Sequence, residues 1–529
     1  MATFDGVVIG GGHNGLTCAA YMARAGLQVA VVERNGALGG GCSTAEVTLP
    51  GFRHNLHSNY HYFEEGPVPR DLELSRYGLR YVYPDVQHAM VFRDGTAVTI
   101  HRDPERTAAS FARFSRRDAE SYRELHEKFA VKARDFVNQV LYSRPLTPAQ
   151  MAGRVTGPIG REMLGYGRLS LYEAVDQHFE DERVRCIFKF FLHAIALENL
   201  PNLGGFFPRL LSRLTRLGLP IGGADAVPRA LGRIVEEHGG RLITGKHVER
   251  IVVKDGRAAG VQLEGGEVLE ARRFVASGVD APQTIRMAGE EHFGDPVVSA
   301  LRGFRWAGHS LVTLHLALSE PPDYAAARFD PDVNRAFLMV MGGDCGEDLE
   351  ANLAQVRRGE LPDRFVGNGC TNTLFDPSLA PPGKHTSFWW PFAPYDLRGG
   401  GAEAWEERRE EVTRRILAEW REFAPNLDER RVLGTYLFTP RDIERSCINM
   451  VRGSHHVGAY LPTQLGASRP TPELSQYRTP VEGLYLCGSS SHSGGSVSGS
   501  PGYNCANTLV EDLELKRWWT PVPSPSWAE

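Results

Sequence analysis

The sequence predicts an α/β fold that opens with a strand–helix–strand unit. An apolar run at residues 5–11 ends in glycine, which is typical of a buried strand. Small and apolar residues recur at helical spacing over 14–25, and Gly26 then ends the helix. A second apolar run, 28–33, closes with an acid. Two buried strands joined by a helix within about 30 residues form the parallel βαβ unit of α/β proteins.

The rest of the chain mixes helical and strand patterns without an internal repeat. The pairs Asp255-Gly256 and Gly265-Gly266 separate short strands in the manner of hairpin turns. The Pro- and Ser-rich tail 520–529 is expected to be frayed. The expected helices cover 102–140, 170–198, 226–238, 404–423 and 503–518, and the expected strands cover 241–245, 248–256, 257–266, 272–278 and 483–488.

Composition excludes several classes of protein. The 529 residues are 42% apolar and 23% charged, which is ordinary for a globular protein. A net charge of −5 offers no basic surface for nucleic acid. The eight cysteines show no CxxC pair and no zinc-site spacing, so we expect reduced thiols and no metal site. With no secretory signal and no apolar run of about 18 residues, the expected location is the cytoplasm.

The first turn carries a Gly-x-Gly-x-x-Gly motif in the context that gives it meaning. Gly10, Gly12 and Gly15 follow the first strand and open the first helix, and Glu33 ends the second strand. In such a motif the glycines allow a tight turn, close approach of a pyrophosphate, and close packing of helix on strand. The helix N-terminus supplies N–H donors, and the acid accepts hydrogen bonds from a ribose hydroxyl. We predict a dinucleotide site; the alternative is a glycine-rich turn with a structural role alone.

The segment after Glu33 favours FAD as the dinucleotide. A second glycine cluster, Gly39–Gly41, follows within a few residues, where flavoproteins run the chain along the cofactor's phosphates and ribityl chain. No second Gly-x-Gly-x-x-Gly follows a strand elsewhere in the sequence, so one dinucleotide site is predicted. A nicotinamide dehydrogenase without flavin is the alternative.

Three long segments carry a family resemblance. They are VVIGGGHNGLTCAAYMARAGLQVAVVERNGALGGGCST, GLPIGGADAVPRALGRIVEEHGGRLITGKHVERIVVKDGRAAGV and YRTPVEGLYLCGSSSHSGGSVSGSPGYNCA. Together they resemble the phytoene desaturase-like flavoproteins, in the branch of the desaturase-type β-carotene ketolase and pyridine nucleotide-disulphide oxidoreductase domain-containing protein 2. The resemblance implies a glutathione-reductase-type Rossmann FAD-binding domain interleaved with a mixed α+β substrate domain. The implied FAD-binding domain comprises 1–75, 222–290 and 475–529, and the substrate domain comprises 76–221 and 291–474.

Motif and resemblance together nominate the residues that contact FAD. The resemblance implies a backbone contact from Val248 and a flavin-facing path through the glycine- and serine-rich stretch 488–504. Where the family usually has proline, glycine and arginine, this chain has Ser493, Ser496 and Tyr503, which sets its substrate-facing surface apart. The predicted contacts are Gly10, Gly12, His13, Asn14, Gly15, Glu33, Arg34, Gly40, Gly41, Cys42, Ser43, His247, Val248, Gly488, Ser489, Gly499, Gly502, Tyr503 and Asn504.

Histidines are the first candidates for acid–base chemistry. The stretch 51–63 holds His54, His57 and His61, and His492 lies in the flavin-facing stretch. Histidine titrates near neutrality, which suits a group that accepts a proton during substrate oxidation. The alternatives are histidines hydrogen-bonded at a domain interface and a His492 that orders its loop. A metal site at His57 and His61 lacks a third ligand.

Two further segments suggest a hydrophobic substrate. Tyr395 ends an aromatic cluster at 389–395 that suits either the wall of an apolar substrate site or a core, and we add this tyrosine to the catalytic candidates. Residues 206–220 place apolar side chains on one helical face and arginines on another. Such a helix either contacts a membrane surface peripherally or packs on its own protein.

The sequence therefore predicts an FAD-dependent oxidoreductase. It would take a hydride from a hydrophobic organic substrate, and oxygen, a quinone or another acceptor would reoxidise the flavin. The alternatives are an amine or alcohol oxidase on the same scaffold, a flavin-dependent isomerase, and a non-catalytic flavin-containing interaction protein. The oligomeric state stays open.

Overall fold

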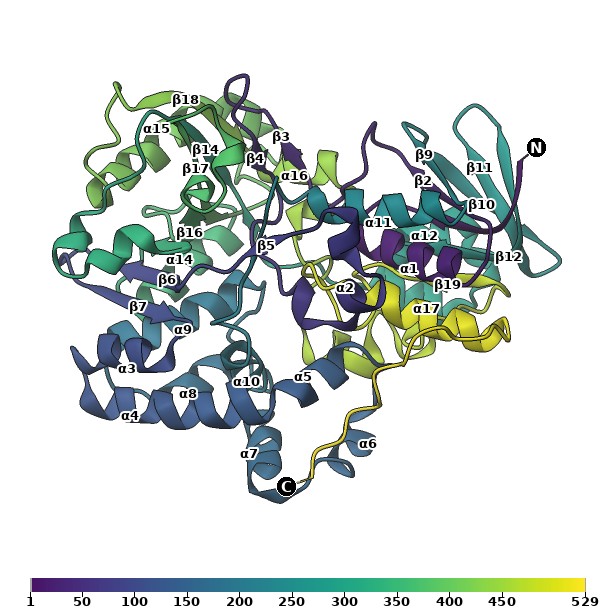
Figure 1. Cartoon of the computed structure of the whole chain (residues 1–529), viewed down its shortest axis with the longest axis horizontal. Helices are drawn as coiled ribbons and strands as arrows, with labels where there is room; N and C mark the ends of the chain where they lie inside the picture. The colour runs from purple at the N-terminus through teal and green to yellow at the C-terminus, as the bar shows by residue number, and fades with distance from the viewer. Residues whose placement is uncertain (1, 529) are drawn as a thin grey trace.

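Two large β-sheets organise the protein, and the computed structural model describes residues 2–528 (Figure 1). The first sheet has seven strands. Three distant parts of the chain form it, while the limits of the two interleaved domains stay a prediction. Its parallel core runs in the order β19 (Leu484–Leu486), β12 (Val268–Ser277), β1 (Ala2–Ile9), β2 (Val29–Glu33) and β9 (Arg241–Thr244), and β11 (Arg257–Leu263) and β10 (Val248–Lys254) extend it antiparallel from β12.

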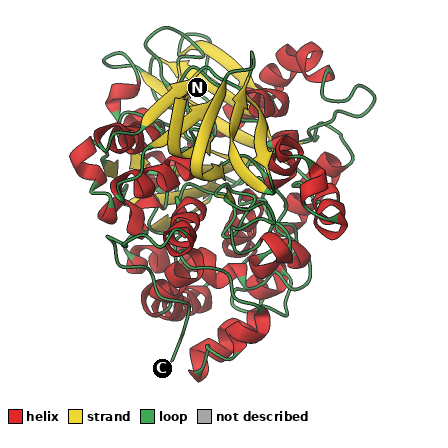
Figure 2. Cartoon of the chain, turned by 90° about the vertical axis from the view of Figure 1, so that its right-hand side faces the viewer, coloured by secondary structure: helices red, strands yellow, loops and turns green. Residues whose placement is uncertain are grey.

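The predicted βαβ unit is present, and helices cover the first sheet on both faces. α1 (His13–Arg24) joins β1 to β2 and packs beside α11 (Ala226–Glu237) and α17 (Ser500–Asp512). Side chains of β1 alternate between the faces: Val8 packs with these helices, and Val7 packs on the other side with α12 (Ala281–Ala288) and α13 (Asp295–Arg302). Figure 2 views the molecule from the side of this sheet. The predicted α/β fold is confirmed.

The second sheet has eight strands and lies on the left of Figure 1. Its strand order is β18 (Val432–Phe438), β14 (Thr313–Leu318), β17 (His385–Ala393), β16 (Gly367–Cys370), β15 (Leu338–Met341), β6 (Val86–Val91) and β7 (Ala97–His101), with β13 (Ser310–Leu311) paired to β17. The long helix predicted at 404–423 is α15 (Ala404–Phe423). Trp389 on β17 packs toward α15, whereas Trp390 points to the opposite face, because side chains of a strand alternate. Each face of this sheet therefore has its own apolar core.

Two long predicted helices are in fact several short ones. The expected helix 102–140 divides into α3 (Pro104–Ala112), α4 (Arg116–Leu125), a π-helical turn at 126–132 and α5 (Arg134–Leu141). Ser115 causes the first break, because its hydroxyl accepts the N–H of Asp118 at 3.0 Å and caps a new helix. The expected helix 170–198 likewise divides into α8 (Leu171–Asp176) and α9 (Glu182–Ala194), where Asp181 caps the second.

Shorter elements complete the chain. The helix expected at 503–518 begins earlier and ends earlier, as α17. The remaining helices are α2 (Pro67–Asp71), α6 (Pro148–Ala152), α7 (Gly157–Tyr166), α10 (Phe206–Leu211), α14 (Gly346–Arg357) and α16 (Pro440–Ser446), and the short strands β3 (Thr44–Ala45), β4 (His54–Asn55), β5 (Tyr81–Val82) and β8 (Leu219–Pro220) pair as β3–β4 and β5–β8.

The amphipathic segment predicted at 206–220 packs on its own protein, the second of the two alternatives, and less of it is helical than predicted. Only the six residues of α10 are helical. The apolar side chains of this segment are buried in the core that packs on the second sheet: Phe207, Leu210, Leu211, Leu214 and Leu217. This segment therefore offers no apolar face for membrane contact.

The tail is also more ordered than its composition suggests. The backbone of Trp527 exchanges hydrogen bonds with Arg154 and Thr156 at 2.9 Å, and its ring packs on Phe136. The aromatic side chain anchors a segment whose prolines alone predict fraying. Within residues 2–528, no helix is long and apolar enough to cross a membrane.

Candidate functional site

One large cavity joins the two halves of the protein. It encloses about 1600 Å³ of empty space, its open mouth included. The first sheet contributes the turns after β1 and β2 and the start of β10. The second sheet and its connections contribute apolar and aromatic side chains, among them Tyr60, Leu311 and Trp390. The cavity therefore has a cofactor end and an opposite wall of different chemistry.

The cofactor end is built around the N-terminus of α1. Gly10 leaves β1 with a φ of 97°, a conformation that favours glycine, and Gly12 caps the helix. A Cβ built on Gly12 would meet no protein atom closer than 3.8 Å. The protein's own packing leaves this space open, which fits a bound pyrophosphate against the backbone.

Glu33 stands beside this turn with its carboxylate held in place. One oxygen accepts the N–H of Gly11 at 2.8 Å, and the other accepts the N–H of Asn35 at 2.8 Å. The side chain is buried yet lines the cavity, together with Lys246 and Val248 from the segment that enters β10. This arrangement fits the adenosine ribose, whose hydroxyls donate to the remaining lone pairs.

Asn14 ties the first helix to the glycine- and serine-rich stretch. Its Nδ2 donates to the hydroxyl of Ser489 at 2.9 Å. Its Oδ1 is buried and has no partner among the described residues, so a hydroxyl of a ligand is the donor that it lacks. His13 reaches the carbonyl of Ser496 across the same gap at 3.2 Å. The residues present therefore fit FAD: the N-terminus of α1 would hold its phosphates, and Asn14 would bond to a ribityl hydroxyl.

The predicted cofactor residues fall into two groups. Those that line the cavity are Gly10, Gly12, His13, Asn14, Gly15, Glu33, Arg34, Gly40, Gly41, His247, Val248 and Ser489. The rest lie behind this wall, where they have protein partners: Cys42, Ser43, Gly488, Gly499, Gly502, Tyr503 and Asn504. Direct contact of the second group with FAD stays a prediction.

His57 is the predicted catalytic residue that lines the cavity. Its Nε2 shares a hydrogen bond with the hydroxyl of Ser446 at 2.9 Å, and its Nδ1 has no partner among the described residues. Burial lowers the pKa of His57 to about 4. The imidazole is therefore neutral near pH 7 and is a weak proton acceptor.

The other catalytic candidates lie outside the cavity lining. His54 bonds to Thr48, His61 to Tyr81, and His492 to the carbonyl of Val140, at 2.8 to 2.9 Å. Burial lowers the pKa of all three histidines, to about 3 for His54 and His61 and about 4 for His492. The hydroxyl of Tyr395 donates to Glu444. Catalytic roles for these four stay predictions.

Sequence reasoning missed part of the opposite wall. Asn59, Tyr60, Tyr62 and Asn368 line the cavity but belong to no motif. Asn368 and Trp390 are cross-strand partners on β16 and β17, so their side chains share one face. The alternation along β17 is the one sequence signal that separates Trp390 from Trp389, and it needs the position of the second sheet to be interpreted.

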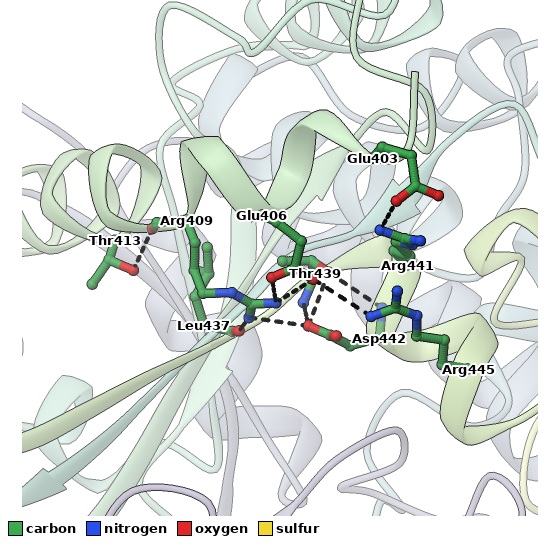
Figure 3. A network of polar contacts seen from close by, with 9 residues as sticks. All are labelled: Glu403, Glu406, Arg409, Thr413, Leu437, Thr439, Arg441, Asp442 and Arg445. Carbon is green, nitrogen blue, oxygen red and sulfur yellow. Dashed lines mark hydrogen bonds and ion pairs between the residues drawn. The ribbon is translucent and has the colours of Figure 1, made fainter. Parts of the chain in front are cut away.

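A polar network fixes α16, the helix that ends at Ser446 (Figure 3). The hydroxyl of Thr439 caps α16 by accepting the N–H of Asp442 at 3.2 Å, and Asp442 accepts the N–H of Thr439 in return at 2.9 Å. Arg409 on α15 pairs with Asp442 at 3.1 Å and also donates to the carbonyl of Leu437. α16 is thereby fastened to the second sheet, and its last residue holds His57.

Known proteins resemble this chain over nearly its whole length. It is 32% identical to a subunit of the limonene dehydrogenase of Castellaniella defragrans, over 98% of this chain and 96% of that one. It is 28% identical to pyridine nucleotide-disulfide oxidoreductase domain-containing protein 2 of Rattus norvegicus, over 97% and 94%. The predicted resemblance to phytoene desaturase-like flavoproteins is confirmed.

The fold has been seen in solved structures. An oxidoreductase from Methanosarcina mazei superposes with a TM-score of 0.61 at 19% identity, over 97% of this chain and all of that one. This likeness confirms the glutathione-reductase-type architecture. Residues 15–500 match the family described as flavin containing amine oxidoreductase. The glycine turn, the ribose acid and this match together identify FAD as the cofactor and the chain as an FAD-dependent oxidoreductase of the flavin-containing amine oxidoreductase family.

Proposed function

We propose that the protein oxidises a hydrophobic organic substrate that carries no positive charge. The observation that carries this proposal is the composition of the cavity wall. Among the described lining residues Glu33 alone is acidic, and it stands at the ribose end. The opposite wall offers Tyr60, Leu311 and Trp390. An apolar body finds contacts there, and an ammonium group finds no carboxylate.

The chain's own residues orient the substrate and accept a proton from it. FAD, when bound, supplies an acceptor for the hydride that leaves the substrate carbon. The neighbouring atom must lose a proton. We assign this proton to Nδ1 of His57, because His57 lines the cavity and this nitrogen has no partner among the described residues. Its low pKa suits a reaction that needs only a weak base, such as formation of a carbon–carbon double bond. Oxygen, a quinone or another acceptor then removes the electrons.

The relatives support a hydrophobic substrate. One is named for limonene, a hydrocarbon, and it aligns with 98% of this chain. An amine or alcohol oxidase on the same scaffold is the second candidate, favoured by the family's description alone. The missing carboxylate in the opposite wall weighs against the amine. A flavin-dependent isomerase and a non-catalytic flavin protein are the further alternatives.

Anaerobic flavin reduction tests the proposal. FAD-loaded protein is mixed without oxygen with limonene, with an alcohol of the same skeleton and with a primary amine of similar size, and the flavin absorbance is followed. We expect bleaching by an uncharged substrate and none by the amine. The variant Gly12→Val, which we expect to lack FAD, controls for reduction elsewhere. Bleaching by the amine alone would replace the proposal with the amine oxidase.

A further inference from the structure

Two buried arginines near the cavity have no acidic partner. Three cationic side chains of the described residues are nine-tenths buried or more, Lys189, Arg213 and Arg469. Lys189 pairs with Asp176 at 2.8 Å. Within residues 2–528, no carboxylate lies within ion-pair distance of either arginine. A buried charge without a counter-charge is costly, so this region is suited to an anion.

A third arginine lies near Arg213 and shares the neighbours His456 and His492 with Arg469. Arg209 on α10 is half-buried, and its guanidinium makes no hydrogen bond within the described chain. The ionisable groups near it are Arg213, Tyr62, Tyr460, His456 and His492, none of them a carboxylic acid. Burial lowers its pKa to about 10, which still leaves it charged near neutrality. Arg209, Arg213 and Arg469 form what we call the arginine cluster.

The arginine cluster lies directly behind the cavity lining, where aromatic rings hold it. Arg213 lies over the ring of Tyr62 at 5.0 Å, and Tyr62 lines the cavity. Arg469 lies over the ring of Tyr460 at 5.0 Å, and the hydroxyl of Tyr460 is 3.3 Å from Nδ1 of the cavity-lining His456. Stacking keeps the guanidinium faces occupied and leaves their edges available for hydrogen bonds.

The three members differ in how many donors are engaged. Arg469 donates to the carbonyls of Val457 at 2.8 Å and Ser489 at 3.1 Å, among others, and so fastens two parts of the wall. Arg213 donates to Asn138 at 3.1 Å. Arg209 keeps all its donors free within the described residues. It is the member equipped to take an anion in the two-pronged manner that guanidinium favours.

We propose that Arg209, backed by Arg213 and Arg469, binds an oxyanion head group of the substrate, whose apolar body lies along the Tyr60–Trp390 wall. The substrate class is then an amphipathic acid, with a carboxylate or a phosphate on a hydrophobic body. This inference rests on the proposed function, which puts the apolar body of the substrate against the Tyr60–Trp390 wall. It also accounts for the shortage of acids in the wall, because the same field that repels an ammonium group attracts an oxyanion.

Matched eight-carbon probes test the anion site on the FAD-loaded protein. Octanoate, octyl phosphate, octanol and octylamine share one chain and differ in head group, and their binding is followed by perturbation of the flavin spectrum and by thermal shift. We expect octanoate or octyl phosphate to bind about tenfold tighter than octanol, and octylamine to bind weakest. The better of the two anions decides between carboxylate and phosphate.

Two variants locate the effect. Arg209→Gln should lose about tenfold in affinity for the preferred anion and none for octanol, and Arg209→Lys should keep part of the preference. Arg216→Gln is the matched control, because Arg216 lies on the same segment but pairs with Glu65 at 3.6 Å. FAD content and thermal unfolding confirm that each variant is folded.

Several outcomes would overturn the inference. Octanol and both anions could bind equally, or the Arg209→Gln variant could keep the preference for the anion. Inorganic phosphate could compete as strongly as octyl phosphate does. The Arg209→Gln variant could also change the flavin potential without changing binding, which would assign the arginine to the cofactor. The proposed function fails separately. If anions bind preferentially but no candidate bleaches the flavin, the proposed oxidation is wrong and the anion site stands. If a candidate bleaches the flavin but anions show no preference, the anion site is wrong and the proposed oxidation stands.

Discussion

The two ends of the cavity are built from different materials. At the cofactor end, backbone and small residues such as Gly10, Gly12 and Gly40 meet where strands of one sheet stop. At the opposite wall, the large side chains of Tyr62 and Trp390 come from connections and strands far apart in sequence. A nucleotide needs access to backbone N–H groups, which a short motif supplies. A substrate needs a shaped surface, which only the assembled fold supplies.

The largest expected effect is the loss of FAD from Gly12→Val. The nearest protein atom to a Cβ at Gly12 is 3.8 Å away, so the side chain has room in the protein but occupies the phosphate space. We expect the purified variant to carry no flavin and the apoprotein to unfold at the temperature of wild-type apoprotein. Gly36→Val is the control, since no atom lies within 4 Å of its Cβ. A Gly12→Val protein that retains FAD would show that the cofactor end does not depend on open space at the glycine backbone.

Acid should destabilise the protein through buried histidines in the opposite wall and behind it. Burial lowers the pKa of His57 and His455 to about 4 and of His54 to about 3, from an ordinary 6.5. Below pH 6.5 the unfolded chain protonates these histidines, whereas the folded chain does not. The free energy of unfolding is therefore highest above pH 6.5 and falls as the pH drops toward these pKa values. Each such histidine lowers the free energy of unfolding by on the order of 3 kcal/mol once the pH has fallen to its pKa in the folded protein.

Denaturant unfolding at pH 7 and pH 5 measures this loss. The substitution His54→Gln should flatten the pH dependence, whereas His292→Gln, at an exposed position, should leave it unchanged. Equal stability at both pH values would show that these imidazoles are accessible to protons in the folded state.

Gly502→Ala should weaken the fold by a smaller amount. A Cβ at this position would lie 2.1 Å from the carbonyl oxygen of Asn14, where α17 crosses α1. The helices must move apart, which costs about 1–3 kcal/mol in the free energy of unfolding. Gly165→Ala in α7 has open space and should cost nothing. Unchanged stability of Gly502→Ala would mean that the two helices are less tightly apposed.

Tyr395→Phe should have the smallest effect. Its hydroxyl bonds to Glu444 and lies outside the cavity lining, so the variant should lose about 1 kcal/mol of stability at most and keep flavin reduction rates within about twofold. Stopped-flow reduction with whichever compound bleaches the flavin in the anaerobic test measures this. A tenfold slower reduction would restore Tyr395 to the catalytic candidates.

The same contrast sets what the sequence can predict. Gly10 to Glu33 lie in one βαβ unit, so their positions follow from local spacing, and the family resemblance adds Ser489. The division of 102–140 into separate helices needed the capping role of Ser115 to be weighed against continuous helical periodicity. His54 and His61 differ from His57 by a few positions, and only the folded loop decides which of them faces the cavity. The arginines of 206–220 read as a solvated helix face, because the sequence does not show that their segment is buried.

During translation, β19 and Ser489 are synthesised long after β1. β1 pairs with β12, so it has no partner on that side until residues 268–277 have been made. The lining of the cofactor cavity is complete only after Val497 has been made. Domains assembled from neighbouring segments fold as soon as those segments emerge, whereas this one cannot close before residues 484–497 are made. FAD capture is therefore a late event, and a chain that stalls before Ser489 carries the glycine turn without a place to enclose the cofactor.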